Sequence, residues 1–177
     1  MTQPILCALS GWSGSGKTTL VCAIVRYLEQ HRGMRVGVIK HDGHCFPPDI
    51  SGSDTRRLTE AGAVRTVLCG ESGLVVRETE PQRLAIEPLV KRFGADLDVL
   101  LFEGFKHAAV DKIEVFRAEL GNEPLFVNPT QYPQVVAVAT DRPLDHETAP
   151  QQLDLNRPEQ IAEFILDRHA ATLRVSA

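Results

Sequence analysis

The chain has 177 residues, and its 43% hydrophobic content is enough to bury one core. Its 19 Lys and Arg residues against 23 Asp and Glu residues give a net charge of -4, whereas nonspecific nucleic-acid binders show a basic excess. The apolar runs are far shorter than the roughly 20 residues that cross a bilayer, and no basic segment precedes the short apolar stretch 5–9. We therefore expect one cytoplasmic domain over residues 1–177, with no membrane or nucleic acid as partner.

The four cysteines, at positions 7, 22, 45 and 69, form no CxxC pair. Their spacing is not that of a disulfide framework. Cys7 lies in a predicted strand and Cys22 in a predicted helix, so we expect both to be small, buried hydrophobic side chains.

The first third of the chain predicts a strand, a tight loop, a helix and a second strand. Residues 5–9 form a short apolar run that stops at a cluster of Gly and Ser. Leu20, Ile24 and Leu28 then recur at helical spacing up to Gly33, and the apolar stretch 36–39 resumes as a strand. This order is a βαβ unit, whose two strands must be parallel.

The rest of the chain continues the alternation. Ser53 or Asp54 is expected to cap a short helix that closes at Gly62. Apolar runs and turn residues predict further strands and helices: strands 64–68 and 74–77 as a pair, a helix over 82–93 that Pro88 starts or kinks, and strands 99–102, 113–116 and 135–139. A C-terminal helix is expected to follow Asn156 as its N-cap, with Pro158 at its start and residues 161–170 in its body. The predicted fold is α/β, three-layered, with a mostly parallel central sheet.

The strongest motif runs from Gly11 to Thr18 and satisfies G-x-x-x-x-G-K-[ST] between a predicted strand and a predicted helix. Its glycines allow backbone N–H groups to surround a phosphate, and the helix N-terminus adds partial positive charge. Lys17 is expected to reach the β and γ phosphates and Thr18 to bind Mg²⁺. The predicted phosphate-binding residues are Gly11, Ser13, Gly14, Ser15, Gly16, Lys17, Thr18 and Thr19, with the hydroxyls of Ser15 and Thr19 as additional contacts.

A carboxylate follows the buried strand 99–102. A P-loop protein needs such a group to hold Mg²⁺ or its water shell, and Glu103 lies at the carboxyl end of this strand, where ligands of α/β proteins bind. Gly104 then lets the backbone approach a γ phosphate. We predict Lys17 and Glu103 as the catalytic pair and Thr18 and Glu103 as the metal ligands; an ordinary exposed acid at a strand end is the alternative for Glu103.

Asp141 follows the predicted strand 135–139. Many GTP-binding P-loop proteins place a carboxylate there that accepts the two N–H groups of guanine. No complete N-K-x-D sequence is present, so a loop aspartate ahead of Pro143 is an equal alternative.

Taken together, several blocks resemble one family. They are the P-loop, Val38-Ile39-Lys40-His41 with His44, Asp49 with Gly52 and Asp54, Ala61-Gly62-Ala63, Leu101-Phe102-Glu103-Gly104-Phe105-Lys106, and the strand that starts at Lys112. The pattern is similar to the MobB family, the molybdopterin-guanine dinucleotide biosynthesis adaptor proteins, over nearly the whole chain.

The resemblance implies a P-loop NTPase fold of the signal-recognition, MinD and BioD type. It also implies binding of GTP with Mg²⁺, weak GTP hydrolysis, a homodimer, and assistance to the MobA guanylyltransferase, which joins GMP to molybdopterin. Lys40, His41 and Asp54 would lie beside the nucleotide or on a surface that meets MobA or molybdopterin. Lys40 is expected to end the strand adjacent to the P-loop strand.

Two other functions stay open at this point. One is an ATP-dependent small-molecule kinase or ligase, with Asp49 or Asp54 as base. The other is a GTP-driven nickel chaperone, in which His41, His44 and Cys45 hold the metal, with Asp49 or His107 as a fourth ligand. Three ligands within five residues are geometrically awkward, so polar residues that line the nucleotide cleft are favoured over a metal site.

Overall fold

The computed structural model describes residues 3–41, 53–71, 73–78 and 85–175. The chain divides into two compact units, one of Met1–His41 with Ala85–Ala177 and one of Asp42–Leu84. The expectation of a single domain over 1–177 stays a prediction.

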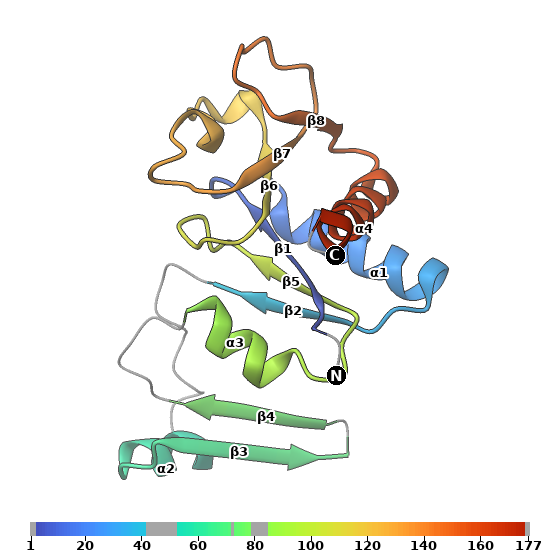
Figure 1. Ribbon diagram of the computed structural model, residues 1–177. Helices are drawn as coiled ribbons and strands as arrows, with labels where there is room; N and C mark the ends of the chain where they lie inside the picture. The colour runs from blue at the N-terminus through green and yellow to red at the C-terminus, as the bar shows by residue number, and fades with distance from the viewer. Residues whose placement is uncertain (1–2, 42–52, 72, 79–84, 176–177) are drawn as a thin grey trace. The chain divides into compact units, whose positions relative to one another are not determined.

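The larger unit is built on a six-stranded sheet in which all neighbouring strands are parallel (Figure 1). The strand order is β2-β5-β1-β6-β7-β8. The strands are β1 Ile5–Ser10, β2 Val36–Lys40, β5 Val99–Glu103, β6 Lys112–Phe116, β7 Val135–Thr140 and β8 Gln151–Asp154. β1, which leads into the phosphate motif, is a central strand.

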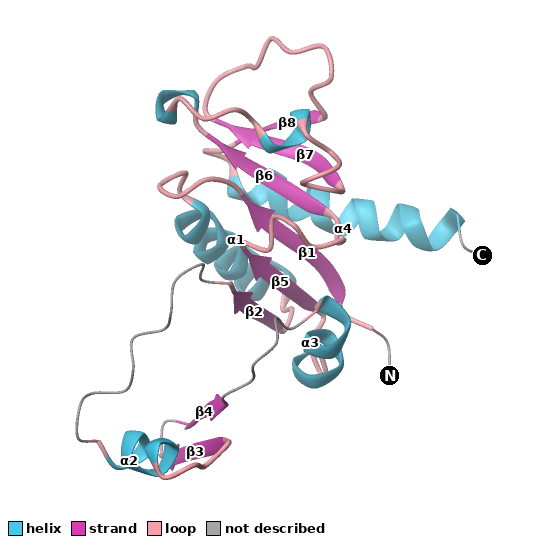
Figure 2. Ribbon diagram, turned by 90° about the vertical axis from the view of Figure 1, so that its left-hand side faces the viewer, coloured by secondary structure: helices cyan, strands magenta, loops and turns pink. Residues whose placement is uncertain are grey.

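Helices cover both faces of this sheet, which gives the three layers that the sequence predicts (Figure 2). α1 (Lys17–Arg32) and α4 (Pro158–Val175) pack on one face, where Leu20, Ile24 and Ile161 join a core with alternate residues of the strands. α3 (Ile86–Phe93) packs on the other face against Ala8, Leu100 and Phe102. Two short 3₁₀ helices follow β6, η1 (Ala118–Leu120) and η2 (Leu125–Val127).

The strand order corrects one expectation. β5 lies between β1 and β2, so Lys40 ends a strand that is not adjacent to the P-loop strand. The βαβ argument fixed only that β1 and β2 are parallel, and a third strand can insert between them. Lys40 is instead the direct register partner of Glu103 on β5.

The predicted helix after the phosphate motif is confirmed. In α1, Leu20, Ile24 and Leu28 are buried, and the helix ends at Gly33, whose φ of 63° is left-handed and whose N–H bonds the carbonyl of Glu29. Cys7 is buried, but Cys22 is exposed, so the expectation of burial was wrong there. Cys22 follows Val21, and it faces solvent because the buried stripe of α1 runs through other positions.

The smaller unit contains α2 (Asp54–Glu60) and the antiparallel pair β3 (Arg65–Gly70) and β4 (Gly73–Glu78). Ser53 caps α2 by accepting from the backbone N–H of Arg56 at 3.4 Å. Many apolar side chains of this unit are exposed, namely Leu58, Val64, Val67, Leu68, Leu74, Val75 and Val76.

Residues 82–84 of the helix expected over 82–93 lie outside the described residues. The described helix α3 begins at Ile86, and Pro88 stands in its first turn, where its missing N–H has no helical partner to lose. Among the described residues, no helix is long and apolar enough to cross a membrane.

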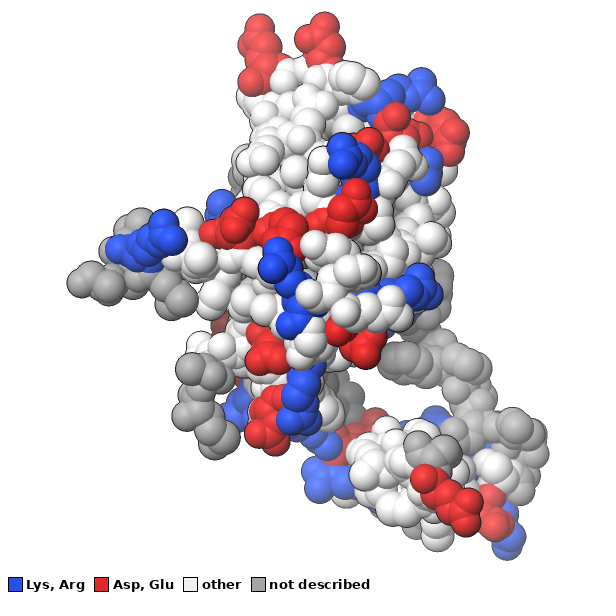
Figure 3. Space-filling view, turned by 90° about the vertical axis from the view of Figure 1, so that its right-hand side faces the viewer, with Lys and Arg blue, Asp and Glu red and all other residues white. Residues whose placement is uncertain are grey.

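Acidic and basic side chains are interspersed on the face of the larger unit that carries α1 and α4 (Figure 3). Some of them join elements: Glu163 of α4 accepts from Arg32 Nε at 2.8 Å and from the hydroxyl of Tyr27 at 2.7 Å, both on α1. These contacts hold the two helices of this layer together.

Candidate nucleotide site

The phosphate motif forms a loop between β1 and α1 whose conformation requires its glycines. Gly11, Gly14 and Gly16 have φ values of 149°, 80° and 94°, a region that side chains with a Cβ rarely adopt. A Cβ on Gly11 would lie 2.4 Å from the carbonyl oxygen of Val115 on β6. The loop therefore lies against the end of β6, and residues Lys17 to Leu20 already belong to α1.

Lys17 is the first residue of α1, and its ammonium donates to the carbonyl of Trp12 at 2.7 Å. This bond folds the side chain back over the loop. Burial lowers the pKa of Lys17, the nearby ammonium groups of Lys40 and Lys106 act in the same direction, and the carboxylate of Glu103 opposes them. A bound phosphate would favour the charged form of Lys17 and so oppose the effect of burial.

Thr18, Glu103 and Lys40 form a compact triad at the carboxyl edge of the sheet. The hydroxyl of Thr18 donates to Glu103 Oε1 at 2.6 Å, and Lys40 Nζ lies 3.0 Å from the same oxygen and 3.4 Å from Thr18 Oγ1. Glu103 is buried, with a side-chain exposure of 6%. The ammonium of Lys40 thus lies next to both predicted metal ligands, which themselves bond directly to each other.

The segment after Glu103 is fixed by close backbone contacts. Gly104 has a φ of 92°, and a Cβ there would lie 3.0 Å from the carbonyl oxygen of His41. The hydroxyl of Ser10 donates to the carbonyl of Gly104. The ring of His41 contacts Phe105 with centroids 5.3 Å apart, so this histidine lies beside the carboxyl edge next to Glu103, to whose carbonyl its own backbone N–H donates.

Lys106 rests on an aromatic platform beside the phosphate loop. Its Nζ lies 4.3 Å from the ring centroid of Trp12 and 5.5 Å from that of Tyr132. The ring nitrogen of Trp12 is itself tethered to the carbonyl of Glu123 at 2.9 Å. The loop residue Trp12 is thereby held from two sides.

Asp141 lies directly after β7, and sequence reasoning missed its partner. Arg117, the residue after β6, donates from Nη1 to Asp141 Oδ2 at 3.1 Å and from Nε to the carbonyl of Ser15 at 3.3 Å. Asp141 Oδ1 and the hydroxyl of Ser15 are buried without a hydrogen-bond partner. The only sequence signal for Arg117 is its place at a strand end, which many residues share.

The other predicted site residues divide into two groups. Ser13 and Thr19 are exposed positions on either side of Lys17. Asp54 begins α2 in the smaller unit, where its carboxylate lies 3.6 Å from Arg57 Nη1. A role for Asp54 beside the nucleotide stays a prediction.

The nickel hypothesis depends largely on residues that cannot be placed, because His44, Cys45 and Asp49 lie outside the described residues. Within the described part of the chain, no group of three or more His, Cys, Asp or Glu side chains is arranged to hold a metal ion. His107 bonds elsewhere, through Nδ1, to the carbonyl of Gln131 at 3.1 Å.

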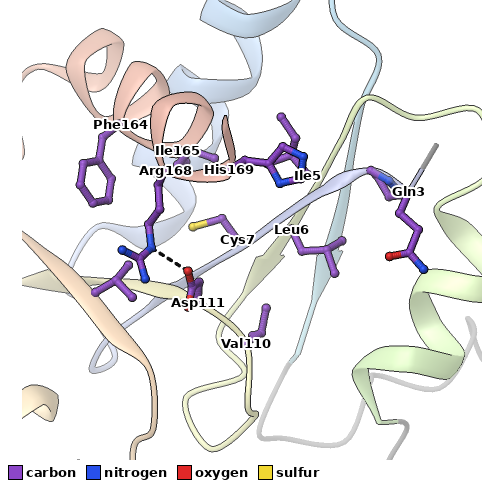
Figure 4. Close-up of a pocket in the computed structure, with 12 residues that line it drawn as sticks. Gln3, Ile5, Leu6, Cys7, Val110, Asp111, Phe164, Ile165, Arg168 and His169 are labelled. Atoms are coloured by element: carbon purple, nitrogen blue, oxygen red, sulfur yellow. Dashed lines mark hydrogen bonds and ion pairs between the residues drawn. The ribbon is translucent and has the colours of Figure 1, made fainter. Parts of the chain in front are cut away.

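A cavity of about 260 Å³ lies at the opposite end of β1, between that strand and α4 (Figure 4). It is lined by Ile5, Cys7, Ile165 and an ion pair between Arg168 Nε and Asp111 Oδ2 of 2.6 Å. Burial raises the pKa of the Cys7 thiol to about 12, so no thiolate is available there at neutral pH. The Cys7 thiol is therefore not a nucleophile in this cavity.

Comparison with known proteins identifies relatives over most of the chain. The family model described as MobB, molybdopterin guanine dinucleotide synthesis protein B, matches residues 6–141. The molybdopterin-guanine dinucleotide biosynthesis adapter protein of Escherichia coli (strain K12) is 36% identical over 165 residues, 92% of this chain and 91% of the relative. The adapter protein of the same name from Haemophilus influenzae is 37% identical over 161 residues, 90% of this chain and 86% of the relative.

A solved structure of a MobB protein homolog from Bacillus stearothermophilus has the same fold. It superposes with a TM-score of 0.66 at 23% identity and covers 92% of this chain and 96% of its own. The part of the chain that the family model matches, residues 6–141, includes the site residues from Gly11 to Asp141.

Proposed function

The chain belongs to the MobB family, and on that premise we propose that it is a GTP-binding adapter protein in the synthesis of molybdopterin guanine dinucleotide. The family is a P-loop nucleotide-binding family. The observation that carries the proposal is the contact of Thr18 with Glu103 at 2.6 Å, because it joins the end of the phosphate loop to a buried carboxylate on the adjacent strand. That pairing is what a nucleotide site with a metal ion requires.

Mg²⁺ fits the chemistry of this pair. A hydroxyl and a carboxylate are the hard oxygen ligands that it prefers, and the ammonium of Lys40 at 3.0 Å from Glu103 marks a place where a cation is stable. When bound, the ion supplies positive charge that shields the β and γ phosphates. A metal ion held by Thr18 and Glu103 would compete with Lys40 for Glu103 Oε1, and Lys40 could then meet the nucleotide or an anionic partner.

We propose that hydrolysis is slow. Lys17 supplies charge to the phosphates, and Glu103 holds the metal side of the site. Arg117 donates to a carbonyl of the phosphate loop, whereas phosphates are bound by the N–H groups of that loop. The charge of Arg117 therefore does not lie on the transferred phosphoryl group. The output of the protein is contact with another enzyme rather than turnover.

The partner that we propose is the MobA guanylyltransferase, with molybdopterin as a further, anionic candidate ligand of Lys40. A homodimer is supported by the exposed apolar side chains of β3 and β4, with Leu74 and Val75 65% and 66% exposed, since such surfaces in soluble proteins are usually covered by protein. We propose a cytoplasmic location, because the proposed ligand GTP is a nucleotide of the cytoplasm.

Retention of the chain by immobilised MobA tests the proposal. We expect retention with GTP and Mg²⁺ and less retention without nucleotide. Lys17→Ala should lose the GTP-dependent part, because the phosphate loop loses its cation, while Lys91→Ala on the exposed side of α3 should behave as wild type. Absence of a complex in both states refutes the adapter role, and calorimetry that finds tighter binding of ATP than of GTP favours the kinase alternative.

A further inference from the structure

One guanidinium joins the two ends of the nucleotide site. Arg117 contacts the carbonyl of Ser15 in the phosphate loop through Nε at 3.3 Å and the carboxylate of Asp141 through Nη1 at 3.1 Å. These two partners follow different strands, β1 and β7, and Arg117 itself follows β6, which lies between them. The side chain therefore spans the carboxyl edge of the sheet from the phosphate loop to the position of the predicted base reader.

One carboxylate oxygen of Asp141 is held by Arg117 and the other has no hydrogen-bond partner. Its side chain is 17% exposed, and Oδ2 accepts from Arg117 while Oδ1 is buried without a partner. A buried acceptor without a partner is unfavourable, so this oxygen favours a ligand that brings an N–H group. Oδ2 also keeps a free lone pair beside the bond to Arg117. The pair of oxygens thus suits two adjacent N–H donors.

Guanine presents such a pair, with N1–H and the 2-amino group side by side. Adenine presents an acceptor at N1, which a carboxylate repels. A carboxylate that rotates freely discriminates poorly between the two bases, because it loses orientation and is hydrated. The bond to Arg117 fixes the carboxylate plane, which is the condition for a specific double hydrogen bond.

Arg117 is itself well fixed. β6, which it follows, is buried at all of its positions, and the backbone carbonyl of Arg117 accepts from Leu120 as η1 begins. The side chain of Leu120 lies beside Gly14, with 3.8 Å from Cδ2 to the place of a Cβ on that glycine. A lysine here would carry the same charge but lacks the planar fork that reaches two acceptors at once.

We propose that Arg117 is a positioning residue for guanine recognition: it orients Asp141 and connects the base-binding end of the site to the phosphate loop. The inference rests on the proposed GTP binding and deepens it. Arg117 need not contact the nucleotide, since it acts through Asp141 and Ser15.

The test compares GTP with inosine triphosphate, which keeps N1–H but lacks the 2-amino group. Affinities for both are measured by calorimetry with Mg²⁺ for wild type, Arg117→Gln, Arg117→Lys and Asp141→Asn. Arg26→Gln on the exposed side of α1 is the charge-matched control. Circular dichroism establishes whether each variant is folded. If Arg117→Gln is unfolded, Arg117→Lys takes its place in the test.

We expect Asp141→Asn to bring the ratio of GTP to inosine triphosphate affinity close to one. Arg117→Gln should lower GTP affinity about tenfold, equivalent to one charge-assisted hydrogen bond, and inosine triphosphate affinity by less, so that the ratio also falls. Arg117→Lys should retain part of the ratio, and Arg26→Gln should keep all of it. The double variant of Arg117→Gln with Asp141→Asn should have the ratio of Asp141→Asn alone.

Two contrary results are distinguishable. If Asp141→Asn leaves the ratio unchanged, Asp141 does not read the base and the inference fails, whereas the proposed function fails only if wild type does not prefer GTP to ATP. Suppose instead that Asp141→Asn removes the preference for GTP over inosine triphosphate, but Arg117→Gln lowers the two affinities equally or leaves both unchanged. Arg117 then only supports the loop. In that case the positioning role is refuted and GTP binding stands.

Discussion

At the scale of single residues, the phosphate motif and Glu103 could be predicted because their chemistry is tied to short local patterns. The structure brings Glu103 to Thr18, as the sequence predicted. Two neighbours could not be predicted. Lys40 meets Glu103 only because β2 and β5 pair in register, and Arg117 meets Asp141 only because β6 and β7 end side by side. Contacts of this kind depend on strand order, which the sequence does not display.

Glu103→Gln should separate metal binding from phosphate binding. The carboxylate attracts Mg²⁺ but repels phosphates, so the variant should bind GTP in EDTA at least as well as wild type. The gain in GTP affinity on adding Mg²⁺ should shrink by about 10-fold to 100-fold, as for other residues that hold or orient a metal. Calorimetry with and without Mg²⁺ measures both effects.

The matched control is Glu29→Gln, an exposed carboxylate near the other end of α1. It removes the same charge and should leave the Mg²⁺ dependence intact. If Glu103→Gln keeps the full response to Mg²⁺, the metal is held by other groups.

At the scale of elements, strands with continuous apolar runs, such as β5, and helices with clear periodicity, such as α1, were predicted correctly. β8 was not predicted, because in Gln151–Asp154 only Leu153 is buried and the run lacks an apolar pattern. The insertion of β5 between β1 and β2 was also missed, since chain order alone does not fix which parallel strands are neighbours.

The phosphate loop gives a prediction at this scale. Gly11→Ala should lower the free energy of unfolding by about 2 kcal/mol or more, the sum of backbone strain and a repulsive contact. The reason is that its Cβ would lie 2.4 Å from the Val115 carbonyl at a φ of 149°. GTP binding should be lost with it, because the loop must move away from β6. Chemical denaturation and calorimetry test both effects.

Gly33→Ala separates the two causes. Gly33 also has a positive φ, 63°, but no atom lies within 4 Å of its would-be Cβ. It should lose only about 1 kcal/mol, the cost of a left-handed residue with a Cβ, and should bind GTP normally. Equal behaviour of the two variants would mean that the close approach of the loop to β6 does not matter.

At the scale of the whole molecule, β6 carries two buried charged residues through the core of the larger unit. Lys112 donates to the carbonyls of Ala108 and Val110 at 2.8 and 3.1 Å, and Glu114 accepts from the N–H groups of Leu125 and Phe126 at 2.7 and 3.2 Å. Both therefore tie loops of the connecting segments to the central strand. The composition showed enough apolar residues for a core, but not that two charges lie inside it.

Glu114 should make stability depend on pH. Burial raises its pKa from 4.5 to about 7, against the two backbone N–H groups, which lower it. Between these values the unfolded chain releases a proton that the folded protein keeps, so this contribution is fully present below pH 4.5 and declines as the pH rises toward 7. The loss amounts to at most about 3 kcal/mol and stays constant at higher pH.

Urea denaturation from pH 4.5 to 8 measures this decline. Glu114→Gln should show a shallower pH dependence over that range. Glu119→Gln, which changes an exposed carboxylate in η1, should keep the wild-type slope. If the slope of Glu114→Gln equals that of wild type, other groups cause the pH dependence.

The place of Trp12 in the phosphate loop has a practical consequence. It is the only tryptophan of the chain, its ring carries the Lys106 ammonium at 4.3 Å, and Lys17 bonds its carbonyl. A nucleotide that draws either lysine to its phosphates changes the electric field at the indole, and with it the emission spectrum. The phosphate loop thus carries the only tryptophan of the chain, and we expect its emission to report nucleotide occupancy in unlabelled protein.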